Sequence, residues 1–461
     1  MRDGVREAVG PTSAASQPET LASAVWRVQA PNDWPAPPAL MSYTALRDIE
    51  TCPLRWALRH AAYPSIWGEK GYPPAPAPAT VGGHVVHVAL ERIVRAAGSG
   101  PGRQSGLLGA GEADSMTLVV ATLRSLGGIS AVLEGVARET AREWEANPRL
   151  RPRAAELSGE LQRQLPVLRP RVQHFLSGVD LARLRSATPA TTDKREGHAR
   201  RQGSSARPLA PGLHAEVPLV NEPLGWYGKA DLLRVGGGAE VTDDEILDFK
   251  TGLPKPDHAF QLRVYALLWA RDSKRNPGRR RARTLRVLYG AGPVDAPAPT
   301  TDGELEAVAV ELAQRTAQAR VAVQQHPPAA RPSREACEWC DVRQMCPAYW
   351  ARPTRATMAL SPEPPRRQVD AGVQVVLRQG AWSWVAVVRE VGALSEEVAH
   401  DARVLLRARP HDEHFAILIA AGQHLRIVAA QFVPPSDESG GLPVLSLTRS
   451  TEVFVRSPAA Q

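Results

Sequence analysis

WYGKADLLRV (226–235), EILDFKTG (245–252) and AFQLRVYALLWARD (259–272) are the three segments that indicate the fold most clearly. The first two segments are short and rich in apolar residues, whereas the third carries its apolar residues at helical spacing. This pattern predicts two neighbouring strands followed by a helix. Strands that alternate with helices predict an α/β domain, so the polar residues of these segments are expected to project from a sheet and from a covering helix.

Further elements are predicted on both sides of this stretch. LHAEVPLV (213–220) and TLRVLYGA (284–291) predict two more strands, and residues 303–326 predict a long helix. Upstream segments have apolar residues at helical spacing and predict helices over 42–63 (two short helices, the first capped by Ser42 or Thr44), 82–95, 114–146 and 152–176.

The remaining segments set the expected domain boundaries. Residues 1–40 are rich in Pro, Ala and small polar residues and are expected to form a disordered leader. A catalytic domain is expected over residues 41–352, with a flexible insertion at the polar, basic segment 184–211. A Pro- and Arg-rich linker is expected over residues 353–368. Residues 369–461 contain several β-type runs, which predict a small all-β domain with an OB-type barrel as one candidate architecture.

Length and composition limit the class of protein. The chain of 461 residues has room for two or three domains, and its net charge of +8 is compatible with a polyanionic partner. No apolar run approaches the length of a membrane span, and the N-terminus lacks the apolar core of a secretory signal. We therefore expect a cytoplasmic protein without membrane association. The sequence has no G-x-x-x-x-G-K-[S/T] phosphate loop, so any ATPase motor must lie on a separate chain.

Two strand carboxylates and a lysine predict a metal-assisted hydrolytic site. Asp231 and Asp248 are expected on neighbouring strands, where their oxygens suit a divalent cation such as Mg²⁺ or Mn²⁺. Alternation along a strand places Asp248 and Lys250 on one face, so the Lys250 ammonium could orient an attacking water or stabilise developing charge. Phe249 is expected to point into the core and to offer its backbone carbonyl as a further hard ligand. These groups suit phosphodiester hydrolysis, because its transition state gains negative charge.

Nearby histidine and glutamate residues extend the candidate site. His87 lies on a predicted helix, and its neutral imidazole is a candidate metal ligand, with His84 one turn earlier as the alternative. Glu91 lies one turn later and is expected to orient the imidazole from outside the metal. Glu216 on the first strand is expected to take a supporting role or to form an ion pair, with direct metal binding also open.

Polar and aromatic residues elsewhere allow more than one role. Gln261 and Tyr265 are four residues apart, so both could reach the substrate from one helix face, or both could be ordinary residues of an amphipathic helix. The basic stretch 279–283 is either a solvated loop or a DNA contact. Trp382 and Trp384 alternate on a predicted strand, where core packing is favoured over base stacking.

The four cysteines of the chain predict a metal centre. Stable disulfides are not expected in a cytosolic protein, and the C-x2-C-x5-C spacing of Cys337, Cys340 and Cys346 indicates metal ligation. Cys52 would be the fourth ligand, and the shared centre would close a loop around nearly the whole catalytic domain. Such a long closed loop restricts the unfolded chain and thereby stabilises the fold. The irregular spacing suits an iron–sulfur cluster, with Zn²⁺ as the alternative.

The order of these motifs resembles the RecB-like branch of the PD-(D/E)XK nuclease superfamily, which includes AddB-type and CRISPR-associated single-strand exonucleases. The resemblance covers about residues 42–350. The matching motifs are G-x-x-x-H at Gly83–His87, G-x-x-D at Gly228–Asp231, D-x-K at Asp248–Lys250, Q-L-x-x-Y at Gln261–Tyr265, the cysteine-bearing first helix at Cys52–Pro53 and C-x2-C-x5-C-P at Cys337–Pro347.

The resemblance implies a fold and a ligand set. It implies a restriction-endonuclease-like core, in which helices flank a mixed sheet, together with a helical insertion. It implies a [4Fe–4S] cluster on the four cysteines. The metal-binding and catalytic set that it implies is His87, Asp231, Asp248 and Lys250.

The resemblance also implies an activity. The protein would be a divalent-metal-dependent DNA nuclease, an exonuclease or DNA-end-processing enzyme that acts on single strands or duplex ends in repair, recombination or phage defence. By analogy, a helicase or ATPase on another chain is the expected partner. Two alternatives are a catalytically inactive DNA-binding subunit of a helicase–nuclease complex and an iron–sulfur redox sensor, and the complete carboxylate–lysine set argues against both.

Overall fold

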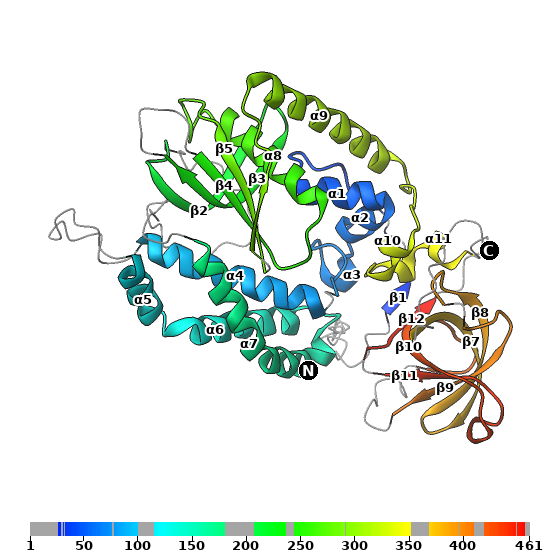
Figure 1. The fold of residues 1–461 in the computed structure, drawn as a ribbon. Coiled ribbons are helices and arrows are strands. Elements are labelled where there is room, and N and C mark those ends of the chain that lie inside the picture. The colour runs from blue at the N-terminus through cyan, green and yellow to red at the C-terminus, as the bar shows by residue number, and fades with distance from the viewer. Residues whose placement is uncertain are drawn as a thin grey trace, which may run out of the picture. The chain divides into compact units, whose positions relative to one another are not determined.

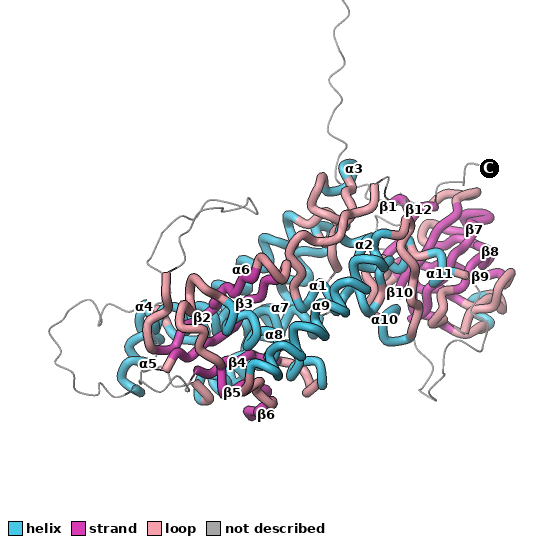
Figure 2. Tube along the Cα trace, turned by 90° about the horizontal axis from the view of Figure 1, so that it is seen from above, coloured by secondary structure: helices cyan, strands magenta, loops and turns pink. Residues whose placement is uncertain are grey.

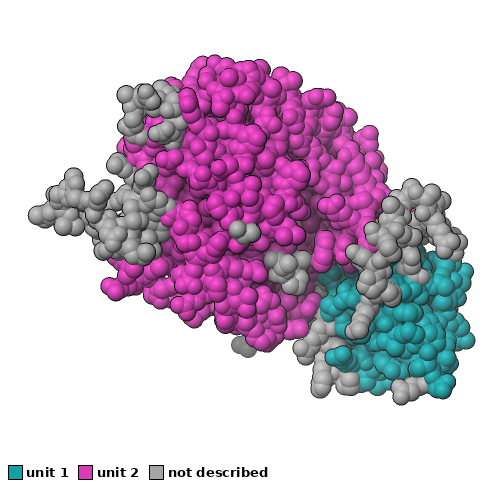
Figure 3. Space-filling model, in the orientation of Figure 1, with its two compact units in different colours: residues 1–29, 361–461 teal, residues 30–360 magenta. Residues whose placement is uncertain are grey.

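The computed structural model has two compact units, which Figure 3 colours separately. The larger unit comprises residues 30–360, and the smaller comprises residues 1–29 together with 361–461. Much of the predicted leader, insertion and linker lies outside the described residues. The described residues are 26–28, 31, 33–75, 78–99, 115–179, 207–236, 244–290, 292–351, 368–395, 397–409, 419–448 and 450–456.

A mixed sheet forms the centre of the larger unit. Its strands lie in the order of the sequence, and neighbouring strands are antiparallel except for β4 and β5, which are parallel. A parallel pair requires a crossover connection, and here the crossover is helix α8 (Pro256–Arg271). The strands are β2 (Gly212–Asn221), β3 (Trp226–Val235), β4 (Asp244–Lys250), β5 (Ala282–Tyr289) and β6 (Gly292–Ala296).

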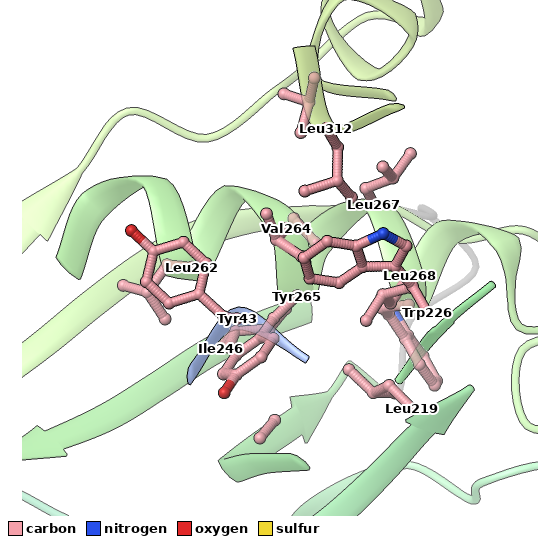
Figure 4. Packing of buried hydrophobic residues seen from close by; sticks show 14 of the residues in the cluster. Tyr43, Leu219, Trp226, Ile246, Leu262, Val264, Tyr265, Leu267, Leu268 and Leu312 are labelled. Carbon is pink, nitrogen blue, oxygen red and sulfur yellow. The ribbon is translucent and has the colours of Figure 1, made fainter. Parts of the chain in front are cut away.

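One face of this sheet packs against α8 and against helices from both ends of the unit (Figure 1). Trp226 is fully buried between the sheet and these helices, and its indole nitrogen donates a hydrogen bond of 3.0 Å to the Thr316 hydroxyl. Figure 4 shows Trp226 in this cluster with apolar residues of α8, Leu219 of β2 and Ile246 of β4. The other helices of this layer are α1 (Tyr43–Thr51), α2 (Pro53–His60) and α9 (Asp302–Gln324), and the short α3 (Pro64–Trp67) follows α2.

The opposite face of the sheet packs against helices that precede it in the sequence (Figures 1 and 2). Phe249 of β4 points into this layer and makes an edge-to-face contact with Phe175, with ring centroids 5.6 Å apart. The side chain of Phe249 therefore lies in the core, as expected. The layer consists of α4 (Pro78–Ser99), α5 (Ser115–Ser125), α6 (Gly128–Ala146), the 3-10 turn Arg151–Arg153 and α7 (Ala154–Ser177).

Three details of the secondary structure differ from expectation. The helix expected over 114–146 is divided into α5 and α6, because Gly127 and Gly128 at the start of α6 have φ angles of 76° and 88°, which the interior of a helix does not accommodate. The strand expected over 245–252 ends at Lys250, and the chain turns at once toward α8. The short edge strand β6 carries no apolar alternation and was not predicted.

The smaller unit is a sheet in which the described strands close on themselves. β7, β8, β9, β11 and β10 pair in that order, and β10 pairs again with β7. All pairs of this ring are antiparallel except β9–β11, and the closed order is compatible with a small barrel of the OB type. The strands are β7 (Gln368–Gly380), β8 (Ser383–Val391), β9 (Arg403–Ala408), β10 (His424–Val433), β11 (Val444–Leu447) and β12 (Glu452–Arg456), and the 3-10 turn Asp437–Ser439 precedes β11.

The segment expected as a disordered leader includes one strand of this unit. β1 (Trp26–Val28) pairs in parallel with β12, so the expectation for residues 1–40 is wrong at these positions. One edge of β12 pairs with β10, and β1 forms backbone hydrogen bonds with the other edge although it lies far away in the sequence. Trp384 is fully buried in the core of this unit, as expected, and Trp382 packs partly buried against the same core.

Within the described part of the chain, no helix is both long enough and apolar enough to cross a membrane.

Candidate active site

Two carboxylates on adjacent strands form the base of the candidate site. Asp231 of β3 and Asp248 of β4 are both almost fully buried. The backbone N–H of Phe249 donates a hydrogen bond of 2.8 Å to Oδ2 of Asp231, which fixes the Asp231 carboxylate against β4. The predicted pairing of these two aspartates on neighbouring strands is therefore present in the fold.

His87 approaches this pair from helix α4. Its Nε2 atom lies 3.6 Å from Oδ1 of Asp231 and 3.7 Å from Oε1 of Glu216. His84, the alternative one turn earlier, is exposed. The close approach of α4 depends on Gly83, because a Cβ atom at this position would lie 2.6 Å from Oγ1 of Thr251. The glycine of the G-x-x-x-H motif therefore admits the end of β4 beside the helix that carries the histidine.

Glu216 is the third carboxylate at this point. The register of β2 and β3 places it directly opposite Asp231, because Ala215 pairs with Leu232 and Val217 pairs with Ala230. Glu216 has a φ angle of 54°, a conformation that costs a non-glycine residue about 1 kcal/mol or more. Its side chain is buried and forms an ion pair with Lys229. The structure thus places Glu216 directly beside His87 and Asp231. The sequence had favoured a supporting role for this residue, away from the metal.

Lys250 lies beside Asp248 on β4. Its Nζ atom is 2.7 Å from Oδ2 of Asp248, which agrees with the predicted placement of both side chains on one strand face. This oxygen of Asp248 is buried and has no hydrogen bond in the described structure apart from its ion pair with the lysine. The Lys250 side chain is about a quarter exposed, so its ammonium can meet a substrate that enters from solvent.

The burial of these charges changes their protonation. Burial raises the pKa of Asp231 well above its ordinary value, and the negative charges of Asp248 and Glu216 raise it further. Burial lowers the pKa of the His87 imidazole despite the same acidic neighbours, so the ring is mainly neutral near pH 7. The protein alone thus stabilises the ionised carboxylates poorly, whereas a bound cation would compensate their charge.

The donor atoms at this point fit a divalent metal ion. His87, Glu216 and Asp231 each offer one ligand atom, and these atoms all lie within 4.8 Å of one another. Carboxylate oxygens with one neutral imidazole nitrogen are suitable donors for Mg²⁺ or Mn²⁺. Asp248 adds a further carboxylate nearby, while the predicted use of the Phe249 carbonyl stays a prediction.

Helix α8 adds a tyrosine and a glutamine to the edge of the site. Nε2 of Gln261 donates a hydrogen bond of 2.7 Å to the Tyr265 hydroxyl. Burial raises the pKa of Tyr265, and the negative charge of Asp248 raises it further. A Cβ atom at Gly228 would lie 2.7 Å from the Tyr265 ring, so the glycine of the G-x-x-D motif makes room for this tyrosine. The predicted grouping of these motifs on one site is present in the structure.

Two further residues lie beside the central groups. Glu91 forms an ion pair of 2.8 Å with Arg95, and its negative charge also opposes the lowering of the His87 pKa by burial. The predicted role of Glu91 in orienting the imidazole stays a prediction. His258 was not predicted; burial lowers the pKa of its imidazole, the charge of Lys250 lowers it further, and the charge of Asp248 opposes this shift. Its only sequence signal is its position three residues before Gln261 on α8.

The basic stretch 279–283 is largely occupied in holding the fold. Arg280 donates a hydrogen bond of 2.9 Å to the carbonyl of Gly236 and also pairs with the buried carboxylate of Asp244. Arg281 pairs with Asp302 at the start of α9. These contacts favour a structural role for the two arginines over the alternative of a DNA contact.

Comparison with protein-family models gives one match over this unit. The model described as the PD-(D/E)XK nuclease superfamily matches residues 40–347, which is about two thirds of the chain. The chain belongs to the PD-(D/E)XK nuclease superfamily. Nucleases of this superfamily use divalent metals to hydrolyse phosphodiester bonds in DNA. A search among curated proteins returns no match.

The cysteines of this PD-(D/E)XK protein lie where the two ends of the matched region meet. Cys52 joins α1 to α2, and its sulfur accepts a hydrogen bond of 3.5 Å from the backbone N–H of Arg331. Cys337 lies in α10 (Arg334–Glu338), and Cys346 precedes α11 (Pro347–Trp350) after the 3-10 turn Arg343–Met345. The four thiols are free.

Electrostatic and polar contacts bind the same two chain ends together. Arg59 of α2 forms a hydrogen bond of 2.6 Å with the Asp341 carboxylate. Burial raises the pKa of Cys340 to about 12, and the neighbouring arginines Arg55 and Arg59 oppose this shift. Burial also raises the pKa of Cys337, and the charge of Cys52 raises it further. Buried thiols of this kind become stable thiolates only when a metal centre binds them.

Proposed function

We propose that this PD-(D/E)XK protein is a RecB-like deoxyribonuclease that degrades or processes DNA from its ends with Mg²⁺ or Mn²⁺. The observation that carries the proposal is the position of His87 Nε2, 3.6 Å from Asp231, beside the Asp248–Lys250 pair. A nuclease needs carboxylates for the metal and a fixed cation for the developing charge, and both are present at one point.

The residues of the site have distinct roles in this proposal. His87, Asp231, Asp248 and the carbonyl of Phe249 hold the divalent ion. When bound, the ion offsets the charge of the attacked phosphate and favours ionisation of a water. The Lys250 ammonium orients the attacking water or stabilises the charge that forms on the phosphate, and it is held in place by Asp248.

Gln261 and Tyr265 position the DNA in this proposal. The Gln261 amide and the Tyr265 hydroxyl are already joined by a hydrogen bond, so they present one fixed polar edge on α8. The raised pKa of Tyr265 keeps its hydroxyl protonated at neutral pH, so it can donate to a phosphate oxygen and does not repel it. Both groups therefore suit substrate binding better than proton abstraction.

An iron–sulfur cluster on Cys52, Cys337, Cys340 and Cys346 is part of the proposal. The irregular spacing of the four cysteines, a C-x2-C pair with two single residues, favours a [4Fe–4S] cluster over zinc, as in the RecB-like nucleases that the chain resembles. Its role would be structural, since it joins the two ends of the nuclease domain.

The biological setting is proposed by analogy with RecB-like nucleases. The sequence lacks a Walker-type phosphate loop, so a helicase or ATPase that delivers DNA would be a separate chain. DNA repair, recombination and phage defence all require the digestion of DNA ends. Each of these settings is compatible with the proposed activity.

The proposed activity is tested by digestion of matched DNA substrates. The substrates are end-labelled linear single strands, end-labelled duplex and covalently closed circles of the same sequence, each with Mn²⁺ and with EDTA. We expect cleavage of the linear DNA with Mn²⁺, little cleavage of the circles, and no cleavage by Asp248→Ala protein. Equal cleavage of circles and linear DNA would refute the end-dependent activity, and no cleavage of any DNA would refute the nuclease proposal.

A further inference from the structure

Glu216 and Asp231 place two carboxylates directly opposite each other across β2 and β3. Like charges at opposite positions of an antiparallel pair repel each other and destabilise the sheet. Both side chains are buried, with 3% exposure for Glu216 and 9% for Asp231, so water screens this repulsion poorly. The fold therefore maintains an unfavourable contact that a cation between the two carboxylates would relieve.

The spacing of the surrounding groups is also unusual for a protein hydrogen-bond network. His87 Nε2 is 3.7 Å from Glu216 and 3.6 Å from Asp231, which is too long for a hydrogen bond to either oxygen. Ligands that are each about 2.1 Å from one ion can lie up to roughly 4.2 Å apart. The two distances thus suit three groups that share an ion better than three groups that bind each other.

The backbone of Glu216 is adapted to this arrangement. Its φ angle of 54° interrupts an otherwise regular strand, while the flanking residues Ala215 and Val217 keep their normal pairing with β3. Glutamate is rarely found in this left-handed conformation, and strained residues of this kind cluster at ligand-binding and active sites. The local distortion directs one carboxylate oxygen toward His87 without disturbing the register of the sheet.

We propose that Glu216 is a direct ligand of the divalent ion, bound together with His87 and Asp231. This inference rests on the proposed nuclease function and adds one residue from β2 to its metal site. The ligand set then draws on α4, β2, β3 and β4, so metal binding joins the helical layer to three neighbouring strands of the sheet.

A purely structural role for Glu216 makes different predictions. Glu216 also pairs with Lys229, whose side chain is 51% exposed, and this ion pair could account for the buried carboxylate. If the ion pair with Lys229 is the function of the Glu216 carboxylate, removing either partner should lower the stability of the metal-free protein. If Glu216 is a ligand, its neutral amide variant should relieve repulsion with Asp231 and raise the stability of the metal-free protein.

The test measures Mn²⁺ binding by calorimetry and melting temperature in EDTA for the full chain, without reference to cleavage. The variants are Glu216→Gln, Lys229→Met as the matched control, and Asp231→Asn as the reference for the metal site. We expect Glu216→Gln to weaken Mn²⁺ binding at least 10-fold and to melt at a higher temperature in EDTA. Lys229→Met should bind Mn²⁺ within about 3-fold of the wild type, because it removes only a half-exposed partner.

Each outcome decides one of the two proposals. Unchanged Mn²⁺ binding by Glu216→Gln, with weak binding by Asp231→Asn, overturns the role of Glu216 and leaves the nuclease proposal intact. Unchanged binding by both variants contradicts the metal site itself. If Glu216→Gln does not fold, Glu216→Asp decides, because it keeps the charge but withdraws the oxygen. We expect Glu216→Asp to bind Mn²⁺ weakly, and wild-type affinity in this variant would overturn the inference.

Discussion

The backbone N–H of Phe249 donates a 2.8 Å hydrogen bond to Oδ2 of Asp231, and this bond links the two strands that carry the aspartates of the candidate site. Because Oδ2 is used in this way, Oδ1 is the oxygen that faces His87 at 3.6 Å. The orientation of the Asp231 carboxylate is therefore set by the backbone of β4. A carboxylate that is fixed before metal binding loses little conformational entropy when the ion binds.

Asp231→Asn should separate the charge of this residue from its shape. The amide oxygen can still accept the hydrogen bond from Phe249, but it binds a divalent cation much more weakly. We expect the rate of DNA cleavage to fall about 10³-fold, which corresponds to about 4 kcal/mol of lost transition-state stabilisation. Initial rates on end-labelled DNA measure this change.

The same variant should not lose stability without metal. Burial raises the pKa of Asp231, so its ionised form is unfavourable in the folded protein at neutral pH. We expect the melting temperature of Asp231→Asn in EDTA to equal or exceed that of the wild type. A lower melting temperature would show that the carboxylate mainly supports the fold.

Lys250→Met should remove catalysis but keep the metal. Its ammonium lies 2.7 Å from Asp248 and competes with a cation for that carboxylate, so the affinity for Mn²⁺ should stay equal or increase. We expect the cleavage rate to fall about 10²-fold or more, because a fixed positive group is lost from the transition state. Single-turnover cleavage at saturating Mn²⁺ measures the effect, and a variant that regains full activity at high Mn²⁺ would contradict this role for the lysine.

Gly82 and Gly83 provide a matched pair of substitutions on α4. A Cβ atom at Gly83 would lie 2.6 Å from Thr251 Oγ1, whereas one at Gly82 would meet Leu168 at an ordinary 3.5 Å. We expect Gly83→Ala to destabilise the domain by about 1–3 kcal/mol through this overlap. Gly82→Ala should stabilise it by about 0.5–1 kcal/mol, because alanine favours the helix.

Chemical unfolding of both variants measures these free energies. Thr251→Ala should restore most of the stability of Gly83→Ala, because it removes the hydroxyl that the new methyl group would strike. If both glycine substitutions change the free energy of unfolding equally, the close approach of α4 to the end of β4 is not needed for stability.

The cysteine centre should contain iron and should support the fold. We expect anaerobically purified wild-type protein to be brown and to contain iron and acid-labile sulfide. Cys52→Ser should lose the colour and unfold at a clearly lower temperature, since it removes the cluster ligand that would join α1 to the C-terminal end of the nuclease domain. Metal and sulfide analysis of the purified protein checks this, and zinc without iron or sulfide would contradict the cluster.

Glu50 and Arg315 should give the nuclease domain a specific acid sensitivity. The Glu50 carboxylate accepts hydrogen bonds of 2.7 and 2.8 Å from Arg315, which joins α1 to α9. Burial alone would raise the pKa of Glu50, but Arg315 and Arg47 outweigh burial and lower it. Because the pKa of Glu50 is lower in the folded than in the unfolded protein, its ionisation stabilises the fold at pH values above the unfolded pKa of about 4.3. This stabilisation is lost as the pH falls through the pKa that Glu50 has in the folded protein.

Glu50→Gln tests this linkage. We expect the variant to be about 1 kcal/mol less stable than the wild type at pH 7, a modest value because the pair is partly exposed to solvent. The difference should shrink as the pH falls below about 4.5. Urea unfolding at several pH values measures it, and a difference that stays constant down to acidic pH would rule out this ion pair as the cause.

Local sequence signals predicted most of the nuclease fold. The strand over 226–235 has the observed bounds, and the helix expected over 259–272 is α8 with a start three residues earlier. The apolar runs were long, and turn residues separated them clearly, so periodicity was sufficient. The break at Gly127 and Gly128 was missed because both flanking segments keep helical spacing, and only the backbone angles reveal the turn.

The candidate site was predictable where a motif fixed the spacing. His87, Asp231, Asp248 and Lys250 lie together because each belongs to a short motif on a predicted element. The position of Glu216 depends on the register between β2 and β3, which the sequence does not specify.

Contacts that join distant or competing residues could not be predicted in the same way. Glu91 was assigned to His87 because the two lie on one helix face, but the additional ion pair of Glu91 with Arg95, one turn further along, was not predicted. β1 was missed because a three-residue strand has no detectable period, and its partner β12 lies at the other end of the sequence.

Anomalous scattering from crystals of the protein soaked in Mn²⁺ would locate the metal directly. We expect one strong anomalous peak within bonding distance of His87 Nε2 and Asp231 Oδ1, next to Asp248 and Lys250. If manganese binds elsewhere while the same protein cleaves DNA with Mn²⁺, the proposed active site is wrong.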